Sequence, residues 1–206
     1  MQTIIWDVDD VLNDLMRVWF EDWISSRNSL NSLSYDQLSS NPPHEILQIS
    51  KSEYLASLDA YRLSEKAQRM QPVPEILDWF ATHGGRFHHV ALTAVPLCAC
   101  HVSAGWVMRN FGRWIQSFNV VPSPRPSDQT GQCHRTKSDF LRWWGKADVL
   151  VDDNPDSVAA ALSLGMNAIL IPRPWNSSPL TIDEALRVLT KLLSCPTRSL
   201  TEGASC

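Results

Sequence analysis

The chain has 206 residues, with 18 Lys and Arg against 22 Asp and Glu, so its formal net charge is −4 at pH 7. This length suits one core domain with a small insertion, and it is long enough to bury a substantial core. The sequence has no basic run and no stretch of about 18 apolar residues, which argues against extended nucleic-acid binding and against a membrane span.

The first predicted element is a short buried strand at residues 3–6. Its apolar run ends abruptly in three carboxylates, Asp7, Asp9 and Asp10. Carboxylates this close repel one another unless a cation lies among them. Open α/β sheets bind ligands at the carboxyl ends of their strands, so the segment indicates a site for a divalent metal and a phosphate. An acidic turn after an edge strand explains this segment equally well.

The residues after this strand predict a helical insertion. Apolar residues at helical spacing indicate helices at 13–27, 45–49 and 52–66, with a polar stretch at 25–40. A right-handed crossover to the next strand needs only a dozen or more residues. We therefore expect residues 13–72 to form a helical cap inserted after the first strand.

The rest of the chain alternates between predicted strands and helices. This alternation predicts an α/β fold, a three-layer α/β/α Rossmann-like parallel sheet. Residues 1–12 and 73–195 would form the core domain, and residues 196–206 a loosely held tail. Strands are expected at 88–93, 118–121, 148–152 and 167–171, and helices at 75–83, 103–111, 138–145, 155–164 and 182–193.

A second pair of acids favours the metal site over the acidic turn. The apolar strand at 148–152 ends in Asp152 and Asp153. If this strand neighbours the first one in a parallel sheet, carboxylates from opposite ends of the chain converge on one point. Hard oxygen ligands of this kind suit Mg²⁺. Two unrelated solvated turns are the weaker interpretation.

Thr93, Ala94 and Lys137 complete a candidate phosphate site. A Thr hydroxyl and the next backbone N–H form a small pocket for one phosphoryl oxygen. Lys137 follows Thr136, a predicted N-cap, so it falls in a first helical turn where the helix dipole disfavours a cation. Its position there indicates an anionic partner. Taken alone, a threonine in a strand and a solvated lysine are both commonplace.

The candidate residues resemble, in their order along the chain, the four motifs of the haloacid dehalogenase-like (HAD) superfamily of phosphohydrolases. They are Asp7-x-Asp9, Thr93, Lys137 and Asp152-Asp153. The resemblance runs from Asp7 to about Ile171. The first and fourth motifs are the specific ones. The second and third motifs are single residues, which support the resemblance mainly through their order and position in the chain. It implies an enzyme that hydrolyses a small phosphomonoester with Mg²⁺.

The resemblance also implies a role for each motif residue. Asp7 would attack phosphorus to give an aspartyl-phosphate, and Asp9 would serve as general acid and then as general base. Lys137 would pair with Asp7 and the phosphoryl oxygens, which Thr93 and Ala94 would also bind. The implied Mg²⁺ ligands are Asp7, the backbone carbonyl of Asp9, and Asp153 or Asp152.

The cap is expected to select the substrate, a small phosphorylated metabolite. The sequence pattern of residues 52–62 is similar to that of caps of the 5′(3′)-deoxyribonucleotidase-like branch. This resemblance implies a nucleotide substrate whose base stacks on an aromatic ring. A sugar phosphate or another metabolite is an equally good interpretation, and most cap aromatics are expected to serve packing. The candidate residues are Arg17, Trp19, Trp23, Tyr54 and Arg62.

Two other functional classes use similar residues. A phosphoacceptor signalling domain also places acids, a Thr and a Lys around Mg²⁺, although its order of motifs differs. A catalytically silent module on the same fold would bind a phosphorylated ligand, but it would have no need of Asp9.

The number of cysteines indicates the compartment in which the protein is expected to be found. Their odd number, five, suits a reducing compartment, and no signal-peptide pattern is present, so a cytoplasmic location is expected. The segment Cys98-Ala99-Cys100-His101 lacks a second ligand pair at zinc spacing. Ordinary thiols are therefore expected there.

Overall fold

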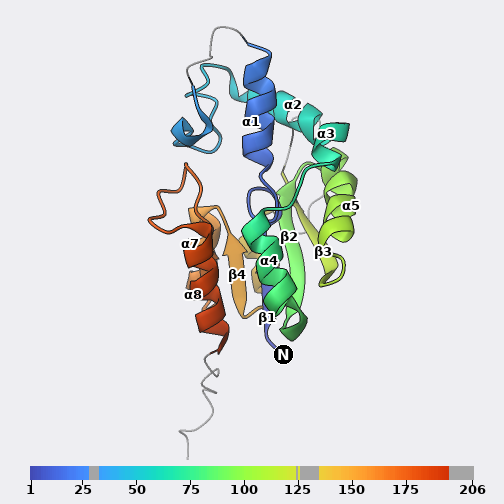
Figure 1. Ribbon diagram of the computed structural model, residues 1–206, viewed down its shortest axis with the longest axis vertical. Helices are drawn as coiled ribbons and strands as arrows, with labels where there is room; N and C mark the ends of the chain where they lie inside the picture. Colours follow the sequence, from blue (N-terminus) through green and yellow to red (C-terminus); the bar gives the residue numbers. More distant parts are fainter. Residues whose placement is uncertain (28–32, 124, 126–134, 195–206) are drawn as a thin grey trace, which may run out of the picture.

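The centre of the protein is a parallel sheet of five strands in the order β3-β2-β1-β4-β5 (Figure 1). The computed structural model describes residues 1–27, 33–123, 125 and 135–194. Because β1 is the central strand, it pairs on one side with β2 and on the other with β4. The strands are β1 (Thr3–Trp6), β2 (His88–Val95), β3 (Ile115–Pro122), β4 (Val149–Asp152) and β5 (Asn167–Leu170).

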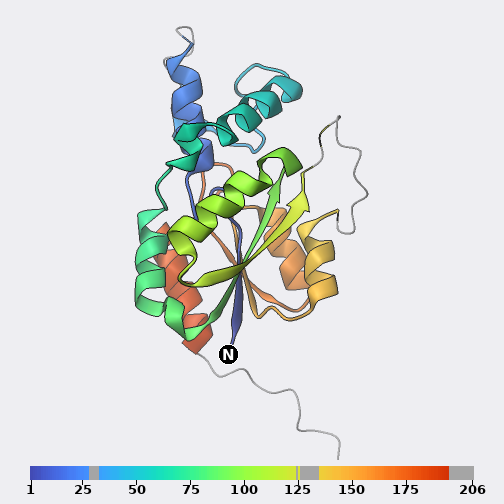
Figure 2. The same ribbon diagram turned by 90° about the vertical axis from the view of Figure 1, so that its right-hand side faces the viewer.

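Helices cover both faces of this sheet (Figure 2). Ile4 and Trp6 of β1 pack in a cluster with α4 (Pro74–His83), α5 (Cys100–Phe111) and α8 (Ile182–Ser194). Ile5, which points the other way, packs with α6 (Lys137–Trp144) and α7 (Pro155–Ser163). The predicted three-layer α/β/α fold is confirmed. None of the helices within the described ranges is long and apolar enough to cross a membrane.

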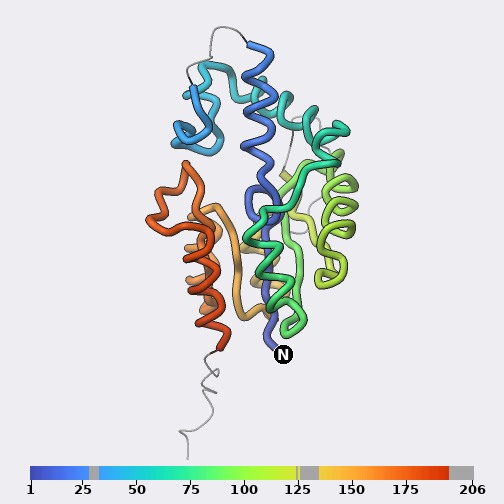
Figure 3. The backbone as a smooth tube through the Cα atoms, in the orientation of Figure 1, coloured from blue at the N-terminus to red at the C-terminus, as the bar shows by residue number. Residues whose placement is uncertain are grey.

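In the segment between β1 and α4, the described residues 13–27 and 33–72 lie beyond the carboxyl ends of the strands, and we call this segment the cap (Figures 1 and 3). Its buried side chains between residues 15 and 67 form a hydrophobic cluster separate from those on the sheet. The chain enters and leaves the cap side by side, since Asn13 and Pro72 form an isolated antiparallel bridge. The cap helices are α1 (Leu15–Ser25), η2 (Tyr35–Gln37), α2 (Lys51–Arg62) and α3 (Glu65–Gln68). The domain boundaries themselves stay a prediction.

The structure departs from the predicted elements in two parts of the cap. The helix expected at 45–49 is a hydrogen-bonded turn, because Gln48 has a left-handed backbone (φ 55°) that ends the helical ladder. The helix expected at 52–66 is divided into α2 and α3, since the Ser64 hydroxyl accepts the Ala67 N–H and starts a new helix.

Elsewhere the strands and helices match to within a few residues. The short 3-10 helices η3 (Gly84–Arg86) and η4 (Leu97–Ala99) flank β2. The predicted tail at 196–206 lies outside the described residues.

Candidate active site

The acidic ends of β1 and β4 meet at one edge of the sheet. Asp7 directly follows β1, and its N–H donates to the Val151 carbonyl of β4 at 2.9 Å. Asp152 is the last residue of β4, and Asp153 follows it. Carboxylate oxygens of Asp7, Asp152 and Asp153 all lie within 4.8 Å of one another. The convergence expected from parallel neighbouring strands is therefore present.

Lys137 reaches this cluster from the first turn of α6. The Thr136 hydroxyl caps the helix by accepting the Asp139 N–H at 3.1 Å. The Lys137 side chain is buried, and its Nζ lies 2.7 Å from both Asp7 Oδ2 and Asp152 Oδ2. The anionic partner expected for this lysine is a pair of carboxylates.

Burial shapes the electrostatics of the cluster. It raises the pKa of Asp7 well above its ordinary value, Lys137 opposes this, and Asp152 and Asp153 add to it. Burial and the neighbouring carboxylates raise the pKa of Asp153 to about 7. Burial alone would lower the pKa of Lys137, but Asp152 and Asp7 raise it. Three carboxylates thus face one ammonium group, and the uncompensated charge suits a divalent cation with oxygen ligands.

The two acids that end β4 have different partners. Both oxygens of Asp152 are engaged, Oδ2 by Lys137 and Oδ1 by the Asn154 N–H at 2.9 Å. Asp153 Oδ2 accepts the Trp175 indole N–H at 2.8 Å. Asp153 also lines the cavity above the cluster, whereas Asp152 does not. Asp153 is therefore the better placed of the two to bind a ligand in the cavity.

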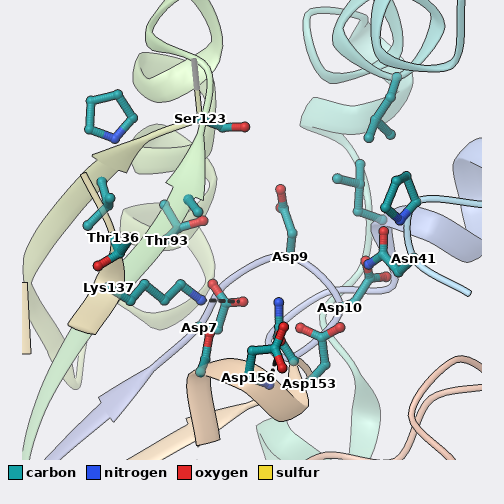
Figure 4. Close-up of a pocket in the computed structure, with 18 of the residues that line it drawn as sticks. Asp7, Asp9, Asp10, Asn41, Thr93, Ser123, Thr136, Lys137, Asp153 and Asp156 are labelled. Atoms are coloured by element: carbon teal, nitrogen blue, oxygen red, sulfur yellow. Dashed lines mark hydrogen bonds and ion pairs between the residues drawn. The ribbon is translucent and has the colours of Figure 1, made fainter. Parts of the chain in front are cut away.

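Asp9 points away from the Lys137–Asp7 ion pair into the cavity (Figure 4). Its Oδ2 accepts from Arg62 Nη2 at 3.0 Å and from Arg62 Nε at 3.3 Å. Its Oδ1 accepts from the Asn13 side-chain amide at 3.3 Å. Asp7 and Asp9 thus present their carboxylates at different levels of one cavity, the first on its floor and the second closer to the cap.

The cavity has a volume of about 650 Å³ and lies between the sheet edge and the cap. In Figure 4, Thr93 lies on the Lys137 side of Asp7, and Asp10 and Asp153 lie on the opposite side. Acids, a hydroxyl and a lysine therefore surround one space. The predicted motif residues that line it are Asp7, Asp9, Thr93, Ala94, Lys137 and Asp153.

Of the five cap residues proposed to contact substrate, only Tyr54 and Arg62 line this cavity. Trp19 is 1% exposed inside the cap cluster, where its indole N–H donates to Ser57 Oγ at 3.1 Å. Trp23 is also buried in that cluster, and the Arg17 guanidinium lies over the Tyr35 ring. The structure does not bring Arg17, Trp19 or Trp23 to the site.

Asp10 and Arg173 belong to the site region, although the sequence analysis counted Asp10 only as one of the acids after the first strand and gave Arg173 no role. Asp10 has a left-handed backbone (φ 62°), and its carbonyl accepts from Arg173 Nε at 2.6 Å. Burial raises the pKa of Asp10 to about 7, with Arg173 opposing that rise. Arg173 and Trp175 follow β5 at the same sheet edge, so the rule that locates Asp7 and Asp153 could also have located them.

The cysteines of the 98–101 segment differ in their exposure. Cys98 is an exposed free thiol, and Cys100 is a free thiol of intermediate exposure. Among residues 1–27, 33–123, 125 and 135–194, the group of potential metal ligands is Asp7, Asp152 and Asp153.

Comparisons with solved structures identify the fold. A HAD-like family hydrolase from Streptococcus pneumoniae superposes with a TM-score of 0.61 at 14% identity, over 93% of this chain and 98% of that one. A protein from Clostridium acetobutylicum, described as a predicted phosphatase, gives 0.56 at 15% identity over 92% and 98%. A Bacillus subtilis protein assigned to the HAD hydrolases, with bound magnesium, gives 0.54 at 13% identity over 94% and 99%.

No protein-family model matches the sequence, and no curated protein matches it. The structural likeness covers nearly the whole chain, cap included. The protein therefore has the HAD-like fold, as the four motifs in the sequence implied. The narrower likeness to 5′(3′)-deoxyribonucleotidases stays a prediction.

Proposed function

We propose that the protein is a phosphohydrolase that removes phosphate from a small phosphomonoester through an aspartyl-phosphate on Asp7. The observation that carries this proposal is the position of the Asp7 carboxylate. It lies on the floor of the cavity, 2.7 Å from Lys137 and beside Asp153. An ammonium group there offsets the charge that builds up when a carboxylate approaches a phosphate.

The reaction has two steps on this chain's own residues. In the first, an Asp7 oxygen forms a bond to phosphorus and the bond to the ester oxygen breaks, while Asp9 gives a proton to the leaving alcohol. In the second, Asp9 takes a proton from water, the water oxygen attacks phosphorus, and Asp7 leaves as a carboxylate. The products are the alcohol and inorganic phosphate.

Asp7, Asp153 and the backbone carbonyl of Asp9 are the residues that we propose to hold Mg²⁺. The three buried acids and the single lysine fit a cation of this charge. Burial first, and the neighbouring carboxylates second, raise the pKa values of Asp7 and Asp153, so a bound cation would stabilise their charged forms. When bound, Mg²⁺ supplies charge neutralisation between the carboxylates and the phosphoryl oxygens. Asp152 has a different part in this proposal, which is to hold Lys137 in place.

The proposed substrate is a small phosphorylated metabolite. Thr93 and the Ala94 N–H would bind the phosphoryl group, and the remainder of the molecule would occupy the cap side of the cavity. That side combines apolar and cationic groups, namely Lys51, Tyr54, Leu55, Leu58 and Arg62. A nucleotide or a sugar phosphate could each be held by such a lining.

A screen of phosphate release tests the proposal. Nucleoside monophosphates and sugar phosphates would be incubated with the protein and Mg²⁺, with an Asp7→Asn variant purified in parallel. We expect phosphate from at least one ester, and a loss on the order of 10³-fold or more in the variant. Turnover that survives Asp7→Asn contradicts the mechanism. Binding of an ester without any release would instead identify a silent binding module.

A further inference from the structure

Four alternating charges connect the core to the cap beside the cavity. Arg62 of α2 binds Asp9 through Nη2 at 3.0 Å, and it binds Asp59 through Nη1 at 3.0 Å. Arg125, which lies beyond β3, donates to Asp59 from Nε at 2.6 Å and from Nη2 at 2.8 Å. The resulting network, Asp9–Arg62–Asp59–Arg125, joins the loop after β1, a cap helix and the segment after β3.

This network is shielded from solvent. Its side chains are only 12–18% exposed. Burial alone would lower the pKa of Arg62, but Asp9 and Asp59 raise it. Exposed ion pairs contribute little, whereas pairs held by several hydrogen bonds away from water define the orientation of the groups they join.

We propose that Arg62 is a positioning residue that holds the Asp9 carboxylate at the level of the leaving group, and that Asp59 and Arg125 fix Arg62 for this purpose. The inference rests on the proposed function and adds a role for Arg62, which the sequence analysis considered only as a substrate contact. Arg62 grips one Asp9 oxygen with two nitrogens, and Asn13 holds the other oxygen. A planar guanidinium is pre-organised for such a grip, which a lysine ammonium reproduces poorly.

The arrangement couples proton transfer to the position of the cap. Asp9 belongs to the loop after β1, whereas Arg62 ends a cap helix, so the contact exists only while the cap lies over the sheet edge. Asp59 and Arg125 make the same kind of bridge on the other side of Arg62. In the arrangement that the structure shows, the Asp9 carboxylate is therefore held by a residue of the cap.

A purely structural tie between cap and core predicts a different pattern of defects. Loosening such a tie would affect every substrate alike. Loss of Asp9 positioning should affect esters with poor leaving groups most, because an activated aryl phosphate needs little protonation. It should leave the phosphoryl site, which Asp7 and Lys137 form, unchanged.

The kinetic test compares Arg62→Gln and Arg62→Lys with Arg27→Gln. Arg27 is a suitable control because it also pairs with a cap carboxylate, Glu53 at 3.1 Å, away from the cavity. For an alkyl phosphate we expect kcat/KM of Arg62→Gln, which reports the first step, to fall by about 10–100-fold, against less than about 3-fold for 4-nitrophenyl phosphate. Arg62→Lys should recover part of this loss. Equal losses on both esters would overturn the proposal.

A double variant tests whether Arg62 acts through Asp9. In an Asp9→Asn background, Arg62→Gln should reduce kcat/KM for the alkyl phosphate by less than about 2-fold, because the group that it positions is gone. A full additional loss, equal to that in the wild-type background, would mean that Arg62 acts independently of Asp9.

A crystal structure of Arg62→Gln gives a readout that needs no turnover. We expect the Asp9 carboxylate to leave its position in the cavity, with the Lys137–Asp7 contact retained. An Asp9 carboxylate that stays in place would refute the positioning role. If the wild-type protein releases phosphate from no ester, the proposed function fails, and this structural result still decides whether Arg62 positions Asp9.

Discussion

The Lys137 ammonium group is held 2.7 Å from Asp152, a fully buried carboxylate whose other oxygen is bound by a backbone N–H. This contact leaves the lysine little freedom to move away from Asp7, which it approaches at the same distance. Asp152 thus fixes the cation that faces the proposed nucleophile. The pairing also makes Lys137 a stabilising residue of the folded protein.

Replacing Lys137 should therefore destabilise the protein as well as abolish turnover. Lys137→Met leaves Asp7 and Asp152 buried without their cation, and removal of one partner from a buried pair costs about 3–5 kcal/mol. Urea unfolding at neutral pH without metal measures the effect. Arg142→Met is the control, since Arg142 pairs with Asp139 on the exposed side of the same helix, and it should cost less than about 1 kcal/mol. Similar costs for both variants would contradict the account.

The metal-free protein should lose stability as the pH rises from about 5 to about 8. Asp10 and Asp153 have pKa values of about 7 in the folded protein, against an ordinary value of 3.8. At these two carboxyls the folded state therefore binds more protons than the unfolded state between these values. Their contribution to stability is fully present below pH 3.8 and is lost as the pH rises through 7.

Thermal unfolding in EDTA across this range checks the prediction. We expect Tm to fall by several degrees, the drop to shrink in Asp153→Asn, and Mg²⁺ to restore most of the loss at the alkaline end by neutralising the acids. A Tm that rises with pH in the metal-free protein, or a drop of equal size in Asp153→Asn, would show that Asp153 does not govern it.

Asp9→Asn should separate substrates by their leaving groups. Without the acid, an alkyl phosphate must leave as an alkoxide, so its kcat/KM, which reports the first step, should fall by about 10²-fold or more, while kcat/KM for 4-nitrophenyl phosphate should be affected much less. Steady-state kinetics on the two esters, with Mg²⁺ saturating, measures this difference. Asp9 is not the general acid if both esters lose the same factor.

The cap aromatics should fall into two groups. Trp19 is enclosed by the cap cluster, so Trp19→Ala should destabilise the protein by about 3–5 kcal/mol and lower kcat/KM for all substrates alike. Tyr54 lines the cavity, so Tyr54→Ala should also weaken transition-state binding of the preferred ester by about 1–3 kcal/mol if that ester carries a base. Urea unfolding and kcat/KM across the ester panel distinguish the two, and the assignment is wrong if Trp19→Ala is the more selective variant.

The central residues of the site were predictable because they lie at or directly after the carboxyl ends of strands. The acids that directly follow two apolar runs lie close together because these runs form neighbouring parallel strands. Thr136 predicted the start of α6 because threonine is a preferred N-cap residue, and Lys137 follows it in the first turn. Local patterns of this kind, namely strand periodicity and helix capping, were sufficient to predict most of the strands and the helices that cover them.

The cap was less predictable because packing decides which side of each helix faces the cavity. Trp19 and Tyr54 both lie at helical spacing, yet the first packs inside the cap and the second borders the cavity. The contact between Asp59 and Arg125 joins residues 66 positions apart, and no local pattern marks it. Asp10 was visible as a third acid, but its buried position depends on a left-handed backbone that the sequence does not announce.

The most direct test of the central claim is to look for phosphate on Asp7. Wild-type protein and Asp9→Asn would be mixed with 4-nitrophenyl phosphate and Mg²⁺, quenched in acid within the first turnover and digested for mass spectrometry. The account predicts a phosphorylated Asp7 that accumulates more in Asp9→Asn, because that variant lacks the base for the second step. Stoichiometric release of nitrophenol with no phosphorylated Asp7 in either protein, or with phosphate on a different residue, would contradict it.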